Sequence, residues 1–125
     1  MRRTLLPQTN DRGDPVAAGA EGWLFLSGCA PFDPEGHLVG AEDPAAQTDQ
    51  VLRNMASALQ TAGGGMDDVL KCNVYLADIR HFEAMNGAFA AHFPDAPPAR
   101  TTVEARLSDP AQLVEIEAVA FLGRD

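Results

Sequence analysis

The segment from Gln112 to Phe121 constrains the fold more than any other part of the chain. Its side chains alternate with the two-residue period of a β-strand. One face of this strand is wholly apolar and comprises Val114, Ile116, Ala118, Ala120 and Leu122. The other face mixes large apolar with acidic groups and comprises Leu113, Glu115, Glu117, Val119 and Phe121. The apolar face predicts a sheet covered by helices, whereas the mixed face predicts cover from a second chain, because a small domain has no third layer.

Four more segments have the composition of β-strands. Trp23–Gly28 is aromatic and branched and follows turn residues, and a shorter strand is expected just before it, near Val16. Val69–Ala77 alternates, and its apolar face is predicted to contain Leu70, Cys72, Val74 and Leu76. Arg100–Leu107 is the fourth, and the turn-forming residues 108–111 are expected to join it to the last strand as a hairpin.

Two helices are predicted between these strands. The first begins at Asp43-Pro44, since aspartate is a good N-cap and proline suits the first helical position, and it ends at the glycines 63–65. The second is capped by Asp78 and stopped by Pro94. Apolar residues recur at three- and four-residue steps, at Val51, Leu52, Met55, Ala58, Leu59 and Ala62 and at Phe82, Met85, Phe89 and Phe93. Together these elements predict an α+β fold with a single mixed β-sheet and two helices packed on one face.

Composition narrows the class of protein. A chain of 125 residues, 46% of them hydrophobic, fits one globular domain covering residues 1–125. The net charge of −9 argues against nucleic acid as a partner, because binding phosphates needs a clustered positive surface. No apolar run approaches the roughly 18 residues of a membrane span, and residues 1–13 contain no signal-peptide core. Cys29 and Cys72 have no metal or redox spacing, so we expect two reduced thiols in a cytoplasmic protein.

The predicted hairpin brings charged side chains together on the mixed face. With four residues in the turn, Glu104 would lie opposite Glu115, and Arg100 would lie about 13 Å further along the same side of its strand. Thr102 shares that side. An extended arginine and a glutamate that reach toward each other would leave a gap about the size of a three-carbon acid.

These residue types suit the binding of a small carboxylic acid and the handling of a water molecule. The planar guanidinium of Arg100 can donate two parallel hydrogen bonds to a carboxylate. A partly buried glutamate such as Glu115 can position or deprotonate a water molecule. The same pattern is equally consistent with a structural ion-pair network at a subunit interface.

Two stretches resemble the signature of the RidA/YjgF family: residues 97–104, PPARTTVE, and residues 113–118, LVEIEA. Further pieces match in order between about Trp23 and Phe121, namely Ser27-Gly28, Gln47-Thr48 with Val51 and Asn54, residues 67–71 (DDVLK), and Asn86 with Phe89 and Phe93. The resemblance implies a chorismate-mutase-like homotrimer whose clefts lie between subunits. It also implies hydrolysis of reactive enamines and imines, such as 2-aminoacrylate, to 2-keto acids and ammonia, without a metal or organic cofactor.

Carried over by position, the resemblance implies roles for individual residues. Arg100 would grip the substrate carboxylate, and Glu115 would manage the attacking water. Gly28 would let its backbone approach the ligand closely, which suits a residue without a side chain. Asn86 would line the cleft, with a helix-surface amide as an equal alternative. No ligand spacing links the three histidines, which are expected at the surface: His37, His81 and His92.

Three positions depart from the pattern of the best-known members of the family. Thr102 stands where they have a cysteine two residues after the arginine, and Cys29 stands where glutamine is common. Residues 13–16, GDPV, replace a Gly-Pro-Tyr segment, so the cleft tyrosine is missing. We expect Cys29 and Thr102 in the substrate-binding wall together with Gly28 and Asn86. These changes bear on the substrate more than on the type of reaction.

Two other functions are compatible with such a fold. A non-catalytic trimer that binds small carboxylates, as a sensor or chaperone, would keep Arg100 and tolerate the loss of Glu115. A ribonuclease, a role sometimes attached to the family, would need a basic groove, and the acidic composition counts against it.

Overall fold

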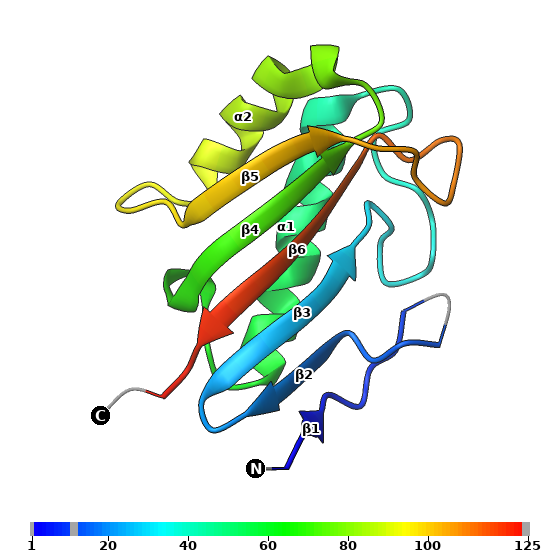
Figure 1. Cartoon of the computed structure of the whole chain (residues 1–125). Coiled ribbons are helices and arrows are strands. Elements are labelled where there is room, and N and C mark those ends of the chain that lie inside the picture. Colours follow the sequence, from blue (N-terminus) through cyan, green and yellow to red (C-terminus); the bar gives the residue numbers. More distant parts are fainter. Residues whose placement is uncertain (1, 11–12, 124–125) are drawn as a thin grey trace.

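The structure, a computed structural model, describes residues 2–10 and 13–123 and has one mixed sheet with two helices on one face (Figure 1). The strands are β1 (Thr4–Leu5), β2 (Ala17–Ala20), β3 (Trp23–Cys29), β4 (Val69–Leu76), β5 (Ala99–Glu104) and β6 (Val114–Phe121). The helices are α1 (Pro44–Thr61) and α2 (Phe82–Ala91), with short 3-10 helices η1 (Met66–Asp68) and η2 (Ile79–His81). The sheet order is β1-β2-β3-β6-β4-β5. The predicted fold class is confirmed, and β1 is an addition that the sequence pattern did not indicate.

The helix ends follow the predicted capping chemistry. The Asp43 carboxylate accepts a hydrogen bond from the Ala46 N–H at 3.1 Å, and Pro44 is the first residue of α1. The chain leaves α1 through Gly63, whose φ of +89° is left-handed and favours glycine. Asp78 caps η2 by accepting from the Arg80 N–H, so the second helix opens with a 3-10 turn before α2 begins at Phe82. The predicted cap is therefore confirmed at α1, whereas Asp78 caps η2 and not α2, whose N-cap is His81.

The apolar face of β6 forms the centre of the core. Its side chains pack under α1 and α2 as predicted, because β6 is the strand between β3 and β4. The largest fully buried side chains come from both helices and from the sheet, and they include Leu52, Met55, Leu59, Leu76, Met85 and Ile116. The two helices also contact each other, which closes the helical layer over one sheet face.

The predicted hairpin between β5 and β6 is wrong. β4 lies between them, parallel to β5 and antiparallel to β6. The connection from β5 to β6 instead passes the end of β4, where Ala105 N donates to Leu76 O and Ala77 N donates to Leu113 O. The reason is the crossover through α2, which brings β5 back beside β4 as a β-α-β unit and leaves the other edge of β4 for β6.

The predicted face of β4 is wrong at one position. The register with β6 shifts between Val69 and Lys71, so Val69 is buried and Leu70 is 51% exposed. An irregularity in a strand adds a residue to one side, and the alternation changes face there. Cys72, Val74 and Leu76 keep the buried positions that the pattern predicts.

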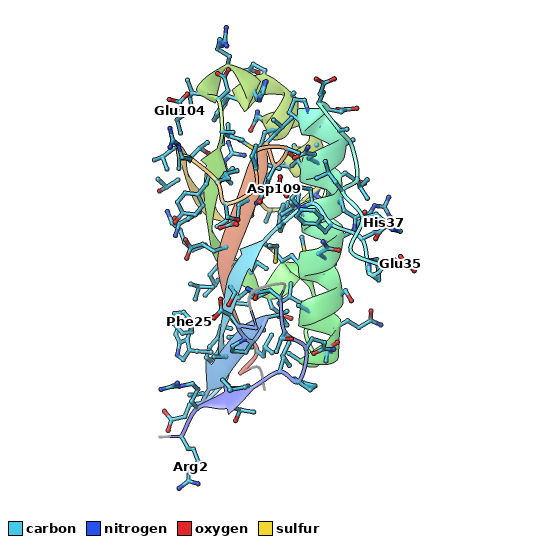
Figure 2. The ribbon with its side chains drawn as sticks, turned by 90° about the vertical axis from the view of Figure 1, so that its right-hand side faces the viewer. Arg2, Phe25, Glu35, His37, Glu104 and Asp109 are labelled. Atoms are coloured by element: carbon cyan, nitrogen blue, oxygen red, sulfur yellow. The ribbon has the colours of Figure 1, made fainter. Side chains whose placement is uncertain are left out.

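The face of the sheet opposite the helices is open. Figure 2 shows Phe25 projecting from this face, away from α1. Phe25 is 56% exposed and Trp23 is 44% exposed, with the Trp23 ring 4.8 Å from that of Phe121. The cover expected for the open face from a second chain stays a prediction.

Among the described residues, no helix is both long and apolar enough to span a bilayer.

Candidate functional site

A cavity of about 670 Å³ opens beside the end of β3, and three of the predicted site residues line it: Gly28, Cys29 and Glu115. The other walls come from the N-terminal segment, α1, the loop after β3 and the segment before β6. Asn54 of α1 holds the loop in place, because its amide donates to the carbonyls of Ala30 at 2.9 Å and Phe32 at 2.8 Å. Gly28 and Cys29 therefore have a rigid surrounding backbone.

Glu115 lies against Gly28. A Cβ atom placed on Gly28 would come within 2.4 Å of Glu115 Oε2, so the position accommodates the carboxylate only as glycine. The other oxygen, Oε1, lies 3.2 Å from the Gln112 side-chain amide. The sequence predicted that Gly28 would allow close approach of a ligand, and the close neighbour in this chain is the carboxylate itself.

Replacing Gly28 with alanine is expected to displace the Glu115 carboxylate while leaving the fold intact. The clash falls on the far end of a flexible side chain, which can rotate away, and the Gly28 backbone does not need a left-handed φ. We expect turnover to fall toward that of a Glu115→Gln variant, with a melting temperature close to wild type. Gly65→Ala is the matched control, because a Cβ there meets nothing within 4 Å. Normal turnover in Gly28→Ala would show that the position of the carboxylate is unimportant.

The two thiols are poor nucleophiles. Burial, with a smaller contribution from the nearby Glu115 carboxylate, raises the pKa of Cys29 to about 12. Burial likewise raises the pKa of Cys72 to about 12. The Cys29 thiol donates to the Ser27 carbonyl at 3.6 Å. At neutral pH a thiol with such a pKa is protonated, so Cys29 can shape the cavity wall but does not supply a thiolate.

Arg100 lies on the helix side of the sheet. It pairs with buried Cys72, and partners across a sheet point to the same face. The guanidinium carbon is 4.7 Å from the centre of the Phe89 ring and 5.5 Å from that of Phe82, within the range of cation–π contacts. Nη2 donates to Asn86 Oδ1 at 2.8 Å. Asn86 is therefore a partner of Arg100 rather than a free helix-surface amide.

The predicted placement of Arg100, Thr102 and Glu104 on the mixed face beside Glu115 is wrong. These three share one side of β5, as predicted, but their partners in β4 are the buried Cys72, Val74 and Leu76. Glu115 pairs with Tyr75, which belongs to the opposite face. Two strand spacings and three residues separate the Cα atoms of Arg100 and Glu115, about 14 Å, and their side chains leave opposite faces. One chain thus carries two separate groups of candidate residues, one around Glu115 and one around Arg100, which we call half-sites.

Two polar side chains beside Glu115 were not predicted from the sequence. Tyr75 donates a hydrogen bond to Glu117 on the open face, and this bond to a carboxylate, with burial second, raises the pKa of the phenol. The alternation of β4 could have placed Tyr75 on that face. Gln112 is 2% exposed. It stands at the start of the last predicted strand, and no role was predicted for it, although alternation puts it on the buried side with Val114 and Ile116.

Within the described residues, no group of three or more His, Cys, Asp or Glu side chains is placed to hold a metal ion. The histidines occupy separate places, and His92 makes a contact with Asp49 at 2.7 Å between Nε2 and Oδ1. The candidate site has two parts: Glu115 with the cavity that it lines, and Arg100 with its neighbours Phe82, Phe89 and Asn86.

The architecture defines a class of protein: a chorismate-mutase-like sheet with paired helices, as found in YjgF proteins. A YjgF-family member from Neisseria meningitidis is 35% identical, with a TM-score of 0.85 over 100% of this chain and 98% of that one. YyfA of Yersinia pestis, from the Rid protein family, is 30% identical, with a TM-score of 0.88 over 96% and 99%. A YjgF/YER057c/UK114 member from Mycobacterium tuberculosis is 28% identical, with a TM-score of 0.83 over 96% and 99%.

Residues 14–122 also match the model of the family described as Endoribonuclease L-PSP. The chain belongs to this family, the Rid/YjgF proteins, and the resemblance recognised in the sequence is confirmed.

Proposed function

We propose that this protein hydrolyses small enamines and imines that carry a carboxylate, giving a 2-keto acid and ammonia. The observation that supports this most directly is the environment of Arg100, whose guanidinium plane is held by two aromatic rings and one amide. Nη2 donates to Asn86 Oδ1 and Nη1 donates to Met85 Sδ at 3.9 Å, and the remaining N–H groups of the guanidinium can bind a carboxylate. A guanidinium held in one plane in this way suits the two oxygens of a planar carboxylate.

The chemistry assigned to Glu115 is the handling of water. An enamine first takes a proton from solvent on its terminal carbon and becomes the iminium ion. Water then adds to the iminium carbon while Glu115 accepts a water proton, and Glu115 passes this proton to the nitrogen, giving a carbinolamine with a protonated amino group. When its C–N bond breaks, the hydroxyl oxygen becomes the keto oxygen, its proton is released through Glu115, and ammonia leaves. The carboxylate lies against Gly28 at the wall of the cavity, where a substrate would bind.

The two half-sites require two copies of the chain to act on one substrate. Within a chain the side chains of Arg100 and Glu115 leave opposite faces of the sheet, so they cannot both reach a three-carbon acid. The open face with Trp23, Phe25 and Phe121 offers apolar surface for association. We infer a homotrimer in which Arg100 of one subunit and Glu115 of another form each cleft.

The purified protein is expected to be a trimer in dilute buffer. Static light scattering should give a mass near 40 kDa, three chains of 13.3 kDa. Phe25→Asp, on the open face, should lower that mass by burying a charge without a partner. Ile79→Asp is the control, because Ile79 is 45% exposed on η2, outside the sheet. A stable wild-type mass near 13 kDa would exclude a shared site.

Subunit mixing provides a second measurement for the same inference. Arg100→Ala and Glu115→Gln chains should each be nearly inactive alone. Co-expressed in equal amounts, they should regain about a quarter of wild-type activity, because a random cleft receives both intact residues once in four. Activity that stays at the level of the single variants would place both residues in one subunit's site.

The proposed reaction is tested with 2-aminoacrylate generated enzymatically in the assay. Release of ammonia and of the keto acid is followed with wild type and Arg100→Ala side by side, after subtraction of the spontaneous rate. We expect wild type to exceed that rate and Arg100→Ala to match it. A wild-type rate equal to the spontaneous one, with carboxylates still bound, would favour a non-catalytic binder. The net charge of −9 makes RNA a poor substrate, and an RNA-cleavage assay on the same sample checks this.

A further inference from the structure

We propose that Gln112 is a positioning residue for Glu115. Its side-chain amide holds one oxygen of the carboxylate, so that the other oxygen faces the cavity beside Gly28, where the attacking water would bind. This inference rests on the proposed deamination and adds a specific requirement to it, since it predicts that the water-handling acid works only in one orientation.

The contact between the two side chains is a part-buried hydrogen bond. Gln112 Nε2 lies 3.2 Å from Glu115 Oε1 and 3.3 Å from the Val114 carbonyl oxygen, so its two N–H groups have separate acceptors. Gln112 is 2% exposed, and both side chains line the same cavity. A buried amide that lost these acceptors would leave polar groups without partners, so its orientation is well determined.

The backbone on both sides of Gln112 is fixed by Gln47 of α1. The fully buried Gln47 amide donates to the Ala111 carbonyl at 3.0 Å, and its oxygen accepts from Leu113 N at 2.7 Å. The Gln112 N–H itself donates to Asp109 O at 3.0 Å, which closes the turn before β6. The Gln112 side chain therefore starts from a rigid point, and its place over Glu115 follows from the packing of α1 on the sheet.

An amide has a chemical advantage in this position. It donates to the carboxylate but neither takes nor releases a proton near neutral pH, so it does not compete with water as the proton source. With Oε1 engaged by Gln112 and Oε2 beside Gly28, the two oxygens of Glu115 have different surroundings. Oε2 is then the atom that would accept the proton from water.

Gln112→Met keeps the length of the side chain and removes its N–H groups, and Gln112→Asn keeps the amide but is one methylene too short to reach. Both variants should lower kcat by about 10- to 100-fold, the effect of losing a hydrogen bond to a charged group, with KM changed by less than about threefold. Gln60→Met, exposed on α1, is the matched control and should have wild-type kcat. Normal kcat in both folded variants would overturn the proposal.

A double-mutant cycle separates positioning from a merely structural role. If Gln112 acts through Glu115, then Gln112→Met should cause no further loss in a Glu115→Gln background. Losses that multiply would overturn the proposal, because they would show an effect on the protein that does not pass through the carboxylate.

Crystal structures of wild type and Gln112→Met give a readout that does not depend on activity. The Glu115 carboxylate should occupy one position in wild type and leave it in the variant. An unmoved carboxylate would overturn the positioning role, even in an active enzyme. If wild type shows no deaminase activity, the proposed function fails, and these two structures still decide whether Gln112 orients Glu115.

Discussion

Arg100→Lys is expected to lower kcat/KM for 2-aminoacrylate by about 100-fold or more, nearly as much as Arg100→Ala. Lysine keeps the positive charge but not the planar fork. A lysine ammonium would lack both the flat surface that packs on Phe82 and Phe89 and the second parallel hydrogen bond to a carboxylate. It would also leave the Asn86 oxygen, now 2.8 Å from Nη2, with a partner of different geometry.

The matched control for Arg100 is Arg106→Lys. Arg106 is exposed just beyond β5 and is outside both half-sites, so this variant should keep wild-type kcat/KM. Steady-state kinetics of all the variants, with melting temperatures to verify folding, complete the comparison. Full activity in Arg100→Lys would show that charge alone suffices and would remove the case for bidentate recognition.

Glu115→Gln is expected to lower the rate constant of hydrolysis by about 10²- to 10⁴-fold, the usual contribution of general acid–base catalysis. The amide keeps the shape of the side chain and still fits beside Gly28, but it cannot accept a proton. Binding of a stable carboxylate analogue should therefore change little, because Arg100 provides that contact. Single-turnover hydrolysis and calorimetry measure the two quantities separately.

Glu117→Gln is the control for Glu115→Gln. Glu117 is the next acid on the same face of β6 and bonds to Tyr75, so it tests whether any carboxylate there matters. We expect it to retain turnover within a few-fold, with its trimeric mass verified. Normal turnover in Glu115→Gln together with a large loss in Glu117→Gln would move the catalytic assignment to Glu117. Loss of both binding and turnover in Glu115→Gln would indicate a structural role.

Local features of this protein could be read from the sequence because they depend on neighbouring residues. Asp43 and Pro44 begin α1 through capping interactions that span one helical turn, and Gly63 ends it through a backbone conformation that other residues avoid. The alternation of Val114 to Ala120 defined a buried strand, since every second side chain must point to the same face.

The site was only partly predictable. Motif resemblance pointed to Arg100, Asn86 and Glu115 as candidates, and the structure brings the first two into contact. Alternation also established that Arg100 and Thr102 share a side of their strand. It could not say which side, because the period of two is the same for both faces.

Strand order was decided by tertiary structure. A four-residue turn after Leu107 looked sufficient for a hairpin, yet the crossover through α2 places β5 beside β4, and β6 pairs on the other edge. This pairing sets Arg100 on the helix side and Glu115 on the other. The contact of Gln112 with Glu115 depends on α1 holding the chain at residues 111 and 113. The sequence by itself determined the two helices, the Asp43 cap, all strands but β1 and the buried face of β6; contacts between segments far apart in the chain decided how the faces meet, because that depends on how all of them pack together.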